Sequence, residues 1–328
     1  MMDSEFPRLA SRVAWDQLPE VSSLTRPIPT DLQQELLAVA PDDILQSPQN
    51  FSPNILSADA QTQLQRLHKI VTSGCGLVTL QAQQLHDDHK LRCLYAVIAR
   101  SFGQLNDRYG HFFDVIDRSR DHTKEAIPVS VTNAATGYHT DSTAKDYFPD
   151  IVGLLCLSAA AEGGDSLVCN AANAFLSIAQ ESPELLPWLT QPIPRDMITP
   201  GFGKSLQAIA ENLIPLFATD QHGLYFRFMR YWIETAFIKL RRRQPEELTA
   251  TLDRIDQYFA EPGHCLQFSL HRGDLLFVNN RFLCHNRTAF RDSGEPRRLV
   301  RAWINIPMQP VSTANPEAFA PTNRNFLS

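Results

Sequence analysis

The 328-residue sequence contains no apolar run long enough to cross a membrane, and its amino terminus, MMDSEFPRLASR, lacks the basic and then apolar segments of a signal peptide. It also lacks a long block of like charge: the formal net charge is −6, and we expect the densest basic run, residues 241–243, at a helix end. These absences argue against a membrane protein and against a nucleic-acid partner. We expect a cytoplasmic globular protein, and composition predicts nothing about its oligomeric state.

The cysteines form no CxxC pair, so the sequence offers no zinc-knuckle motif. Most of them have apolar neighbours, which predicts buried free thiols in a reducing compartment rather than disulfides. There are six: Cys75, Cys93, Cys156, Cys169, Cys265 and Cys284.

The first part of the chain, residues 1–57, is rich in proline and has one expected helix at 31–40. We interpret it as an arm packed on the core. Apolar residues at helical spacing predict helices over 58–73, from 87 or 88 to 102, and over 245–260. A strand is expected at 76–80, after the SGCG turn.

After residue 106, short apolar segments alternate with turn signals and no internal repeat is visible. This pattern is typical of a β-sandwich or a jelly roll. The expected strands cover residues 112–116, 127–132, 151–157, 166–169, 265–270, 274–278 and 299–306.

Two His-x-Asp tripeptides occur, whereas 10 His and 36 acidic residues among 328 would give about one His-x-Asp/Glu by chance. His86 and Asp88 open an expected helix, where residues two apart diverge around the axis, so we interpret this tripeptide as a cap. His139 and Asp141 border a strand-like segment, where residues two apart share a face. They are either metal ligands or ordinary polar residues beside a turn.

A third ligand would have to come from a distant segment. NNRFLCHNR offers His285 after a short strand, although a histidine at a strand end also occurs without a metal. Two imidazoles and one carboxylate on one face of a divalent ion leave its other positions open, as in non-haem Fe(II) oxygenases.

Downstream, RRLVRAW read as a strand puts Arg297, Leu299, Arg301 and Trp303 on one face. Two arginines on a largely apolar strand are costly to bury without an anionic partner. That partner is either a bound carboxylate or an acidic residue of the protein.

Four motifs together resemble the Fe(II)/2-oxoglutarate-dependent dioxygenases of the taurine dioxygenase and clavaminate synthase-like superfamily, over about residues 74–307. They are HTD at 139–141, GGDS at 163–166, NNRFLCHNR around His285, and RRLVR at 297–301. The resemblance implies a mainly β fold, a double-stranded β-helix (jelly roll) core flanked by helices. We expect one such domain over residues 58–310, followed by a tail at 311–328.

The resemblance also implies the site and its chemistry. His139, Asp141 and His285 would be the iron ligands, with 2-oxoglutarate and O2 as cosubstrates. Arg297 would bind the distal carboxylate of 2-oxoglutarate, Ser166 would add a hydroxyl contact, and Arg301 is a further candidate for the same cosubstrate. The implied reaction is hydroxylation or desaturation of a small metabolite, with decarboxylation of 2-oxoglutarate to succinate.

The sequence departs from the superfamily at two positions: the first keeps the hydroxyl that the cosubstrate contact needs, and only the second bears on the substrate. Ser166 stands where threonine is usual, and Asp141 follows the taurine dioxygenase type, whereas FPDIVGLLCL at 148–157 and NNRFLCHNR are similar to the clavaminate synthase group. We expect an amino acid or a derivative. The candidate substrate contacts are Asn133, Tyr138, Arg227 and Arg230, although the last two stand in an aromatic stretch and are equally compatible with a solvent-facing role.

Two other functions use the same residues. A metal-dependent hydrolase would activate water at His139, Asp141 and His285, but it would leave Arg297 and the GGDS turn unexplained. A non-catalytic jelly-roll binding protein would have no need for an intact set of ligands.

Overall fold

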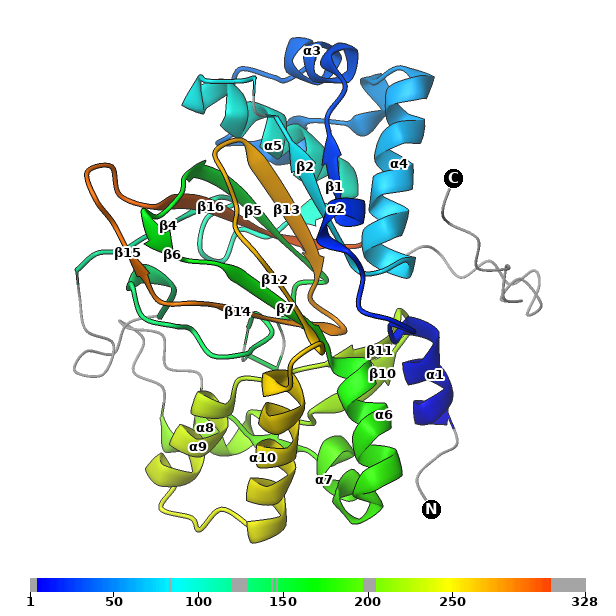
Figure 1. The fold of residues 1–328 in the computed structure, drawn as a ribbon, viewed down its shortest axis with the longest axis vertical. Coiled ribbons are helices and arrows are strands. Elements are labelled where there is room, and N and C mark those ends of the chain that lie inside the picture. Colours follow the sequence, from blue (N-terminus) through cyan, green and yellow to red (C-terminus); the bar gives the residue numbers. More distant parts are fainter. Residues whose placement is uncertain are drawn as a thin grey trace.

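The computed structural model of the protein describes residues 5–82, 84–119, 129–142, 144–145, 147–196 and 205–307. Its centre consists of two packed sheets (Figure 1). The larger sheet has the strand order β1-β2-β13-β5-β16-β3, and β4 also pairs with β16. Its strands are β1 (Thr25–Pro27), β2 (Leu77–Gln81), β3 (Gln104–Leu105), β4 (Phe113–Ile116), β5 (Ile151–Ser158), β13 (Asp274–Asn279) and β16 (Arg298–Asn305).

The smaller sheet has the order β12-β7-β14 and is antiparallel throughout. Its strands are β7 (Ser166–Asn170), β12 (Cys265–Phe268) and β14 (Leu283–Arg287). The two sheets share a buried apolar cluster to which both contribute, for example Leu276 and Val278 of β13 and Val168 of β7. This two-sheet core is the predicted jelly roll.

Strand β13 shows how the sequence positions the core. All six of its residues are buried. Leu276 and Val278 face the smaller sheet, while Leu275 and Phe277 belong to the cluster formed with the helices behind the larger sheet. Because successive side chains of a strand point to opposite faces, a continuous apolar run is what a strand covered on both sides requires.

Helices cover the outer face of the larger sheet: α3 (Thr30–Ala38), α4 (Ala58–Ser73) and α5 (Asp88–Phe102) (Figure 1). The side chain of Asp87 accepts a hydrogen bond from the Lys90 N–H at 2.7 Å and caps α5, and Gly103 follows its last residue. The predicted helices and the interpretation of the first His-x-Asp tripeptide as a cap are confirmed.

A second helical layer lies beside the smaller sheet, at the bottom of Figure 1. Its apolar cluster includes residues of α6 (Ala171–Glu181), α7 (Leu186–Thr190), α9 (Arg230–Lys239) and α10 (Glu246–Ala260). A hairpin of β10 (Phe217–Asp220) and β11 (Gly223–Phe226) packs there too, and α8 (Leu206–Glu211) lies nearby. Of these elements, the sequence predicted α10 alone.

The amino-terminal residues in the described part contact both layers. Helix α1 (Glu5–Val13) packs on α6, α2 (Val21–Leu24) follows, and β1 pairs in parallel with β2. Two hydrogen bonds, from Trp15 N to Asn173 Oδ1 at 2.7 Å and from Asn170 Nδ2 to the Val13 carbonyl at 2.7 Å, fix this segment. The domain boundaries stay a prediction, and the tail at 311–328 lies outside the described residues.

One predicted strand, at residues 127–132, is wrong over its described part, because Val129–Val131 forms a 3-10 helix. Residues 127 and 128 lie outside the described residues. His285 was expected at a strand end but lies in the middle of β14, where the ladder with β7 fixes its backbone. The ladder continues past His285 because Arg287 pairs with Ser166.

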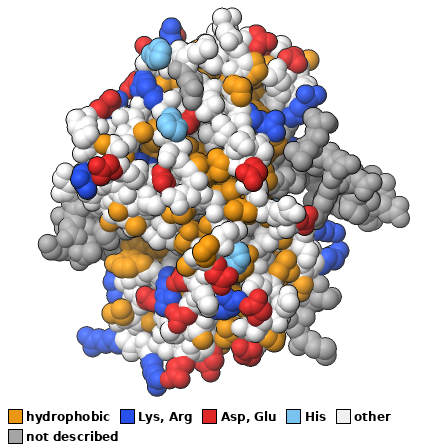
Figure 2. Space-filling model, viewed as in Figure 1, with side chains coloured by type: hydrophobic (Ala, Val, Ile, Leu, Met, Phe, Trp, Pro, Cys, Tyr) orange, Lys and Arg blue, Asp and Glu red, His pale blue; other side chains and the backbone are white. Residues whose placement is uncertain are grey.

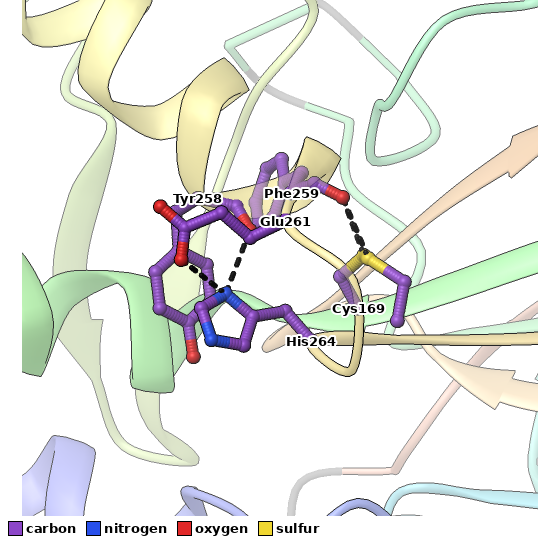
Figure 3. Close-up of a disulfide and its surroundings, with 6 residues drawn as sticks. Cys169, Tyr258, Phe259, Glu261 and His264 are labelled. Atoms are coloured by element: carbon purple, nitrogen blue, oxygen red, sulfur yellow. Dashed lines mark hydrogen bonds and ion pairs between the residues drawn. A yellow bond between two sulfur atoms is a disulfide. The ribbon is translucent and has the colours of Figure 1, made fainter.

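The prediction of free thiols is wrong for two cysteines. Cys169 of β7 and Cys265 of β12 are direct register partners and form a disulfide with a Cα–Cα distance of 4.5 Å (Figure 3). They stand 96 residues apart in the sequence, so only the strand pairing shows that they meet. Cys75, Cys93, Cys156 and Cys284 are free, as predicted.

No helix among the described residues is long and apolar enough to span a membrane. On the face shown in Figure 2, Lys and Arg side chains are interspersed with Asp and Glu. This distribution agrees with the absence of a like-charged block in the sequence.

Candidate metal centre

The two histidines of the site are held together by their own backbones. His139 forms an isolated antiparallel bridge with His285, in which each N–H donates to the carbonyl of the other at 2.9 Å. A second bridge joins His139 to Met229. Asp141 lies two residues after His139, and its side chain points toward both imidazoles. The segments that carry His139 and His285, which are far apart in the sequence, are therefore adjacent in the structure.

The three side chains converge on one point. Asp141 Oδ1 lies 3.6 Å from His139 Nε2 and 3.7 Å from His285 Nε2, and the imidazole centroids are 4.4 Å apart. These separations are too long for hydrogen bonds between the groups. Ligand atoms of all three residues lie within 4.8 Å of one another. A buried carboxylate oxygen facing two imidazole nitrogens without bonding either is an arrangement that a divalent metal ion satisfies.

The electrostatics favour the protonation states that a metal needs. Burial raises the pKa of Asp141, but the Arg301 guanidinium and the two imidazoles outweigh it and hold this pKa well below its usual range. Burial, together with His139, lowers the pKa of His285, so its imidazole is neutral near pH 7. The Nδ1 of His139 lies 2.9 Å from the Gly137 carbonyl, which assigns the proton to Nδ1 and leaves Nε2 free to bind.

A pocket adjoins these residues between the two sheets. It is lined by all six residues that the sequence assigned to iron and 2-oxoglutarate: His139, Asp141, Ser166, His285, Arg297 and Arg301. Its other walls include Val152, Leu154, Val168, Leu276, Val278 and Leu299. The pocket thus combines apolar walls with charged groups at a few points, as small-molecule sites do.

Arg297 is 5% exposed and lies against the GGDS turn. Its Nη2 donates to the Gly164 carbonyl at 3.4 Å, and its guanidinium lies 5.2 Å from the Phe290 ring. Gly163 and Gly164 have φ values of +68° and +76°, and a Cβ at Gly163 would clash with the Ala289 carbonyl. Glycine at 163 therefore lets the turn pack against Ala289, and a Cβ at Gly164 would lie only 3.1 Å from Arg297 Nε.

Arg287 is a pocket residue that the sequence analysis missed. It lies two residues beyond His285 on β14, on the same face, and is 8% exposed. Its Nη2 donates to the Thr132 carbonyl at 2.8 Å, and burial lowers its pKa to about 10. The sequence could have indicated Arg287, because it lies two residues after His285 on a strand, the same spacing that pointed to Asp141 after His139. Ser130, Thr136 and Asn286 also line the pocket and carried no signal.

The four residues suggested as substrate contacts do not line this pocket. Tyr138 packs against Phe259 at a centroid distance of 5.2 Å, and burial raises its pKa to about 12. Asn133 is an exposed residue, and its backbone carbonyl accepts a hydrogen bond from the Phe290 N–H.

The two arginines of the aromatic stretch have partners within the protein. Arg227 is 4% exposed and donates to the carbonyls of Ser142 and Ala144, in the segment after Asp141. Arg230 forms ion pairs at 2.7 Å with Glu234, Asp253 and Asp256. Arg227 thus fixes the backbone next to a candidate ligand, and Arg230 is neutralised by protein carboxylates.

The fold and the site define a jelly-roll protein with two histidines and one aspartate at the mouth of an inter-sheet pocket. The family model described as "Taurine catabolism dioxygenase TauD, TfdA family" matches residues 36–303, and the chain belongs to this family. The family resemblance and the fold predicted from the sequence are thereby confirmed. Members of this class are oxidoreductases that use Fe(II) and 2-oxoglutarate, as expected.

Two curated relatives are similar over part of their length. FR-33289 synthase of Streptomyces rubellomurinus is 28% identical over 183 residues, which are 53% of this chain and 51% of the relative. A uridine-5'-phosphate dioxygenase of a Streptomyces species is 29% identical over 193 residues, 56% of this chain and 66% of that protein. The match thus spans about half the length of the first and under two thirds of the chain.

Solved structures share the fold at low identity. Asparagine oxygenase in complex with Fe(II), 2S,3S-3-hydroxyasparagine and succinate has a TM-score of 0.63 at 16% identity, covering 86% of this chain and 93% of its own. The non-heme iron oxygenase OrfP in complex with Fe and alpha-ketoglutaric acid has a TM-score of 0.59 at 14% identity, with coverages of 86% and 93%.

Proposed function

We propose that this protein is an Fe(II)/2-oxoglutarate-dependent oxygenase that hydroxylates or desaturates a small metabolite, coupled to decarboxylation of 2-oxoglutarate to succinate. The observation that carries the proposal is the meeting of His139, Asp141 and His285 beside a pocket that also contains Arg297 and Ser166. A metal site alone would suit many reactions. A buried guanidinium in the same pocket adds a site for a carboxylate.

Each group of residues would have a separate role. His139, Asp141 and His285 would hold the iron, which when bound supplies the activation of O2 for removal of a substrate hydrogen. Arg297 would hold the distal carboxylate of 2-oxoglutarate through charge-assisted hydrogen bonds, and the Ser166 hydroxyl would donate another. Leu154, Leu276 and the other apolar walls would exclude water from the reacting groups.

The proposed substrate is an amino acid or an amino-acid derivative. Two proteins of the same fold were solved in complex with 3-hydroxyasparagine and with L-Arg, and one relative is a uridine-5'-phosphate dioxygenase. The substrate screen should therefore contain free amino acids and nucleoside monophosphates. Succinate formed above the uncoupled background identifies a substrate, and mass spectrometry then shows a gain of one oxygen or a loss of two hydrogens.

A spectroscopic experiment tests the activity without a known substrate. Anaerobic addition of Fe(II) and then 2-oxoglutarate should give a visible charge-transfer band with the wild-type protein. Asp141→Ala should abolish the band, whereas Asp114→Ala, which removes an aspartate paired with Arg92, should retain it. A metal hydrolase or a non-catalytic binding protein would give no band with 2-oxoglutarate, and that result would exclude our proposal.

A further inference from the structure

The two oxygens of the Asp141 carboxylate have different surroundings. Oδ1 faces the imidazoles of His139 and His285. Oδ2 points away from them and accepts a hydrogen bond from the Trp303 indole Nε1–H at 2.5 Å and another from Arg301 Nη1 at 3.3 Å. The carboxylate side chain is 5% exposed, so no bulk solvent competes for Oδ2. Its orientation is therefore set by these two donors.

Trp303 is itself held rigidly. It lies on β16, where its register partner on β5 is Val152. Its ring packs edge-on against Tyr109 at 5.4 Å and in a tilted arrangement against Tyr147 at 5.6 Å, and the Arg301 guanidinium lies over it at 4.7 Å. A large side chain with one fixed N–H donor and packed faces is suited to holding a partner in one orientation.

Orientation matters because a carboxylate binds a metal through one oxygen or through both. If Asp141 turned so that both oxygens faced the ion, it would occupy a second coordination position. The three-ligand arrangement leaves the opposite positions open for exchangeable ligands, and loss of one of them would interfere with a chelating cosubstrate.

We propose that Trp303 is a positioning residue that keeps Asp141 a one-oxygen ligand by hydrogen-bonding its second oxygen. Trp303 does not line the pocket and does not touch the ligand nitrogens, so it acts through Asp141. The inference rests on the proposed metal site. Arg301 Nη1 also donates to this oxygen, at 3.3 Å, and Trp303 supplies the surface over which the Arg301 guanidinium lies.

Trp303→Phe removes the N–H donor and keeps an aromatic ring between Tyr109 and Tyr147. Trp15→Phe is the matched control, because the Trp15 indole also donates one hydrogen bond, to the Cys75 carbonyl at 2.8 Å, far along the chain from the metal residues. As a third protein, Trp303 is replaced by benzothienylalanine, which has the shape of tryptophan with sulfur in place of N–H. This replacement separates loss of the hydrogen bond from loss of ring volume.

Anaerobic titration with Co(II), followed by its visible d–d bands, measures affinity and coordination without turnover. We expect both Trp303 variants to bind Co(II) about 10- to 100-fold more weakly, as is typical when a hydrogen-bond partner of a metal ligand is lost. The band intensities should change as well, while Trp15→Phe matches the wild type. Circular dichroism monitors folding. If Trp303→Phe is unfolded, the Co(II) affinity and spectrum of the benzothienylalanine protein test the inference instead.

Two results would overturn the inference, and they are distinguishable. If the wild type binds Co(II) and a folded Trp303 variant gives the same affinity and spectrum, Trp303 does not position Asp141 and the proposed function stands. If the wild type itself binds neither Co(II) nor Fe(II), the proposed function and the inference both fail.

Discussion

Asn280 holds the main chain of Asp141 from both sides. Its Oδ1 accepts the Asp141 N–H at 2.7 Å, and its Nδ2 donates to the Asp141 carbonyl at 3.2 Å and to the Pro149 carbonyl at 2.9 Å. Asn280 is fully buried. The backbone of the candidate ligand is thus attached to the turn between β13 and β14, and β14 carries His285.

Asn280→Ala should therefore destabilise the protein around the candidate metal centre. The change leaves three buried backbone groups without their partner, and we expect the free energy of unfolding to fall by about 2 to 4 kcal/mol. Urea denaturation measures it. Asn50→Ala, which removes an exposed bond to Asp43, is the control and should cost less than about 0.5 kcal/mol. Equal effects of the two variants would contradict the role given to Asn280.

The two neighbouring arginines at the start of β16 allow a matched test of cosubstrate binding. Arg297 lines the pocket, whereas Arg298 points outward and pairs with Asp88 at 3.1 Å and Glu295 at 2.9 Å. Loss of a charged hydrogen bond costs about 1.5 to 3 kcal/mol, so Arg297→Gln should raise the KM for 2-oxoglutarate roughly 10- to 150-fold. Steady-state succinate assays measure it. Arg298→Gln should leave this KM unchanged, and a similar KM for both variants would refute the assignment.

His68 of α4 gives the stability a dependence on pH. Burial lowers the pKa of His68 below its usual value of 6.5, and its ring packs against Phe102 at 5.6 Å. The unfolded chain therefore takes up the proton at higher pH than the folded protein, so stability should fall as the pH drops through about 6.5. Denaturation at pH 7.5, 6.5 and 5.5 should show a smaller decrease for His68→Gln than for the wild type. His222→Gln, at an exposed turn, is the control, and equal slopes in all three proteins would contradict the prediction.

The Cys169–Cys265 bond should contribute to stability. It joins β7 to β12 across 96 residues of sequence, and a disulfide typically stabilises a protein by about 2 to 4 kcal/mol. Reduction with dithiothreitol, or Cys265→Ser, should therefore lower the melting temperature. Cys75→Ser, at a free thiol, is the control. Mass spectrometry of the unreduced, alkylated protein should find four reactive thiols after unfolding, and six would contradict the bond.

Much of the fold was predictable because its signals are local. The stripe of α5, the Asp87 cap and the run of β13 follow from side-chain periodicity and capping chemistry alone. Helix α9 was missed because RYWIETAFIK has a weak apolar stripe and follows directly on an aromatic strand. The 3-10 turn at Val129–Val131 was mistaken for a strand because β-branched residues such as its two valines favour strands.

The part of the candidate site that could be predicted consists of residues whose type and spacing suggest metal binding. His139, Asp141 and His285 combine rare residue types with a period of two, and the structure brings them together. The role of Trp303 depends on the approach of β16 to the Asp141 loop, and the Cys169–Cys265 pair depends on a register between distant strands. Such contacts are set by tertiary structure, so a single sequence does not reveal them.

The backbone bridge between His139 and His285 has a consequence for how such a protein diversifies. Because two main-chain hydrogen bonds fix the backbone separation of the two histidines, this separation does not rest on contacts among the pocket side chains. Substitutions in the pocket walls therefore leave the hydrogen bonds that join the two histidine backbones in place. The lining of the pocket can therefore vary among descendants of this scaffold while the two histidine backbones keep their spacing.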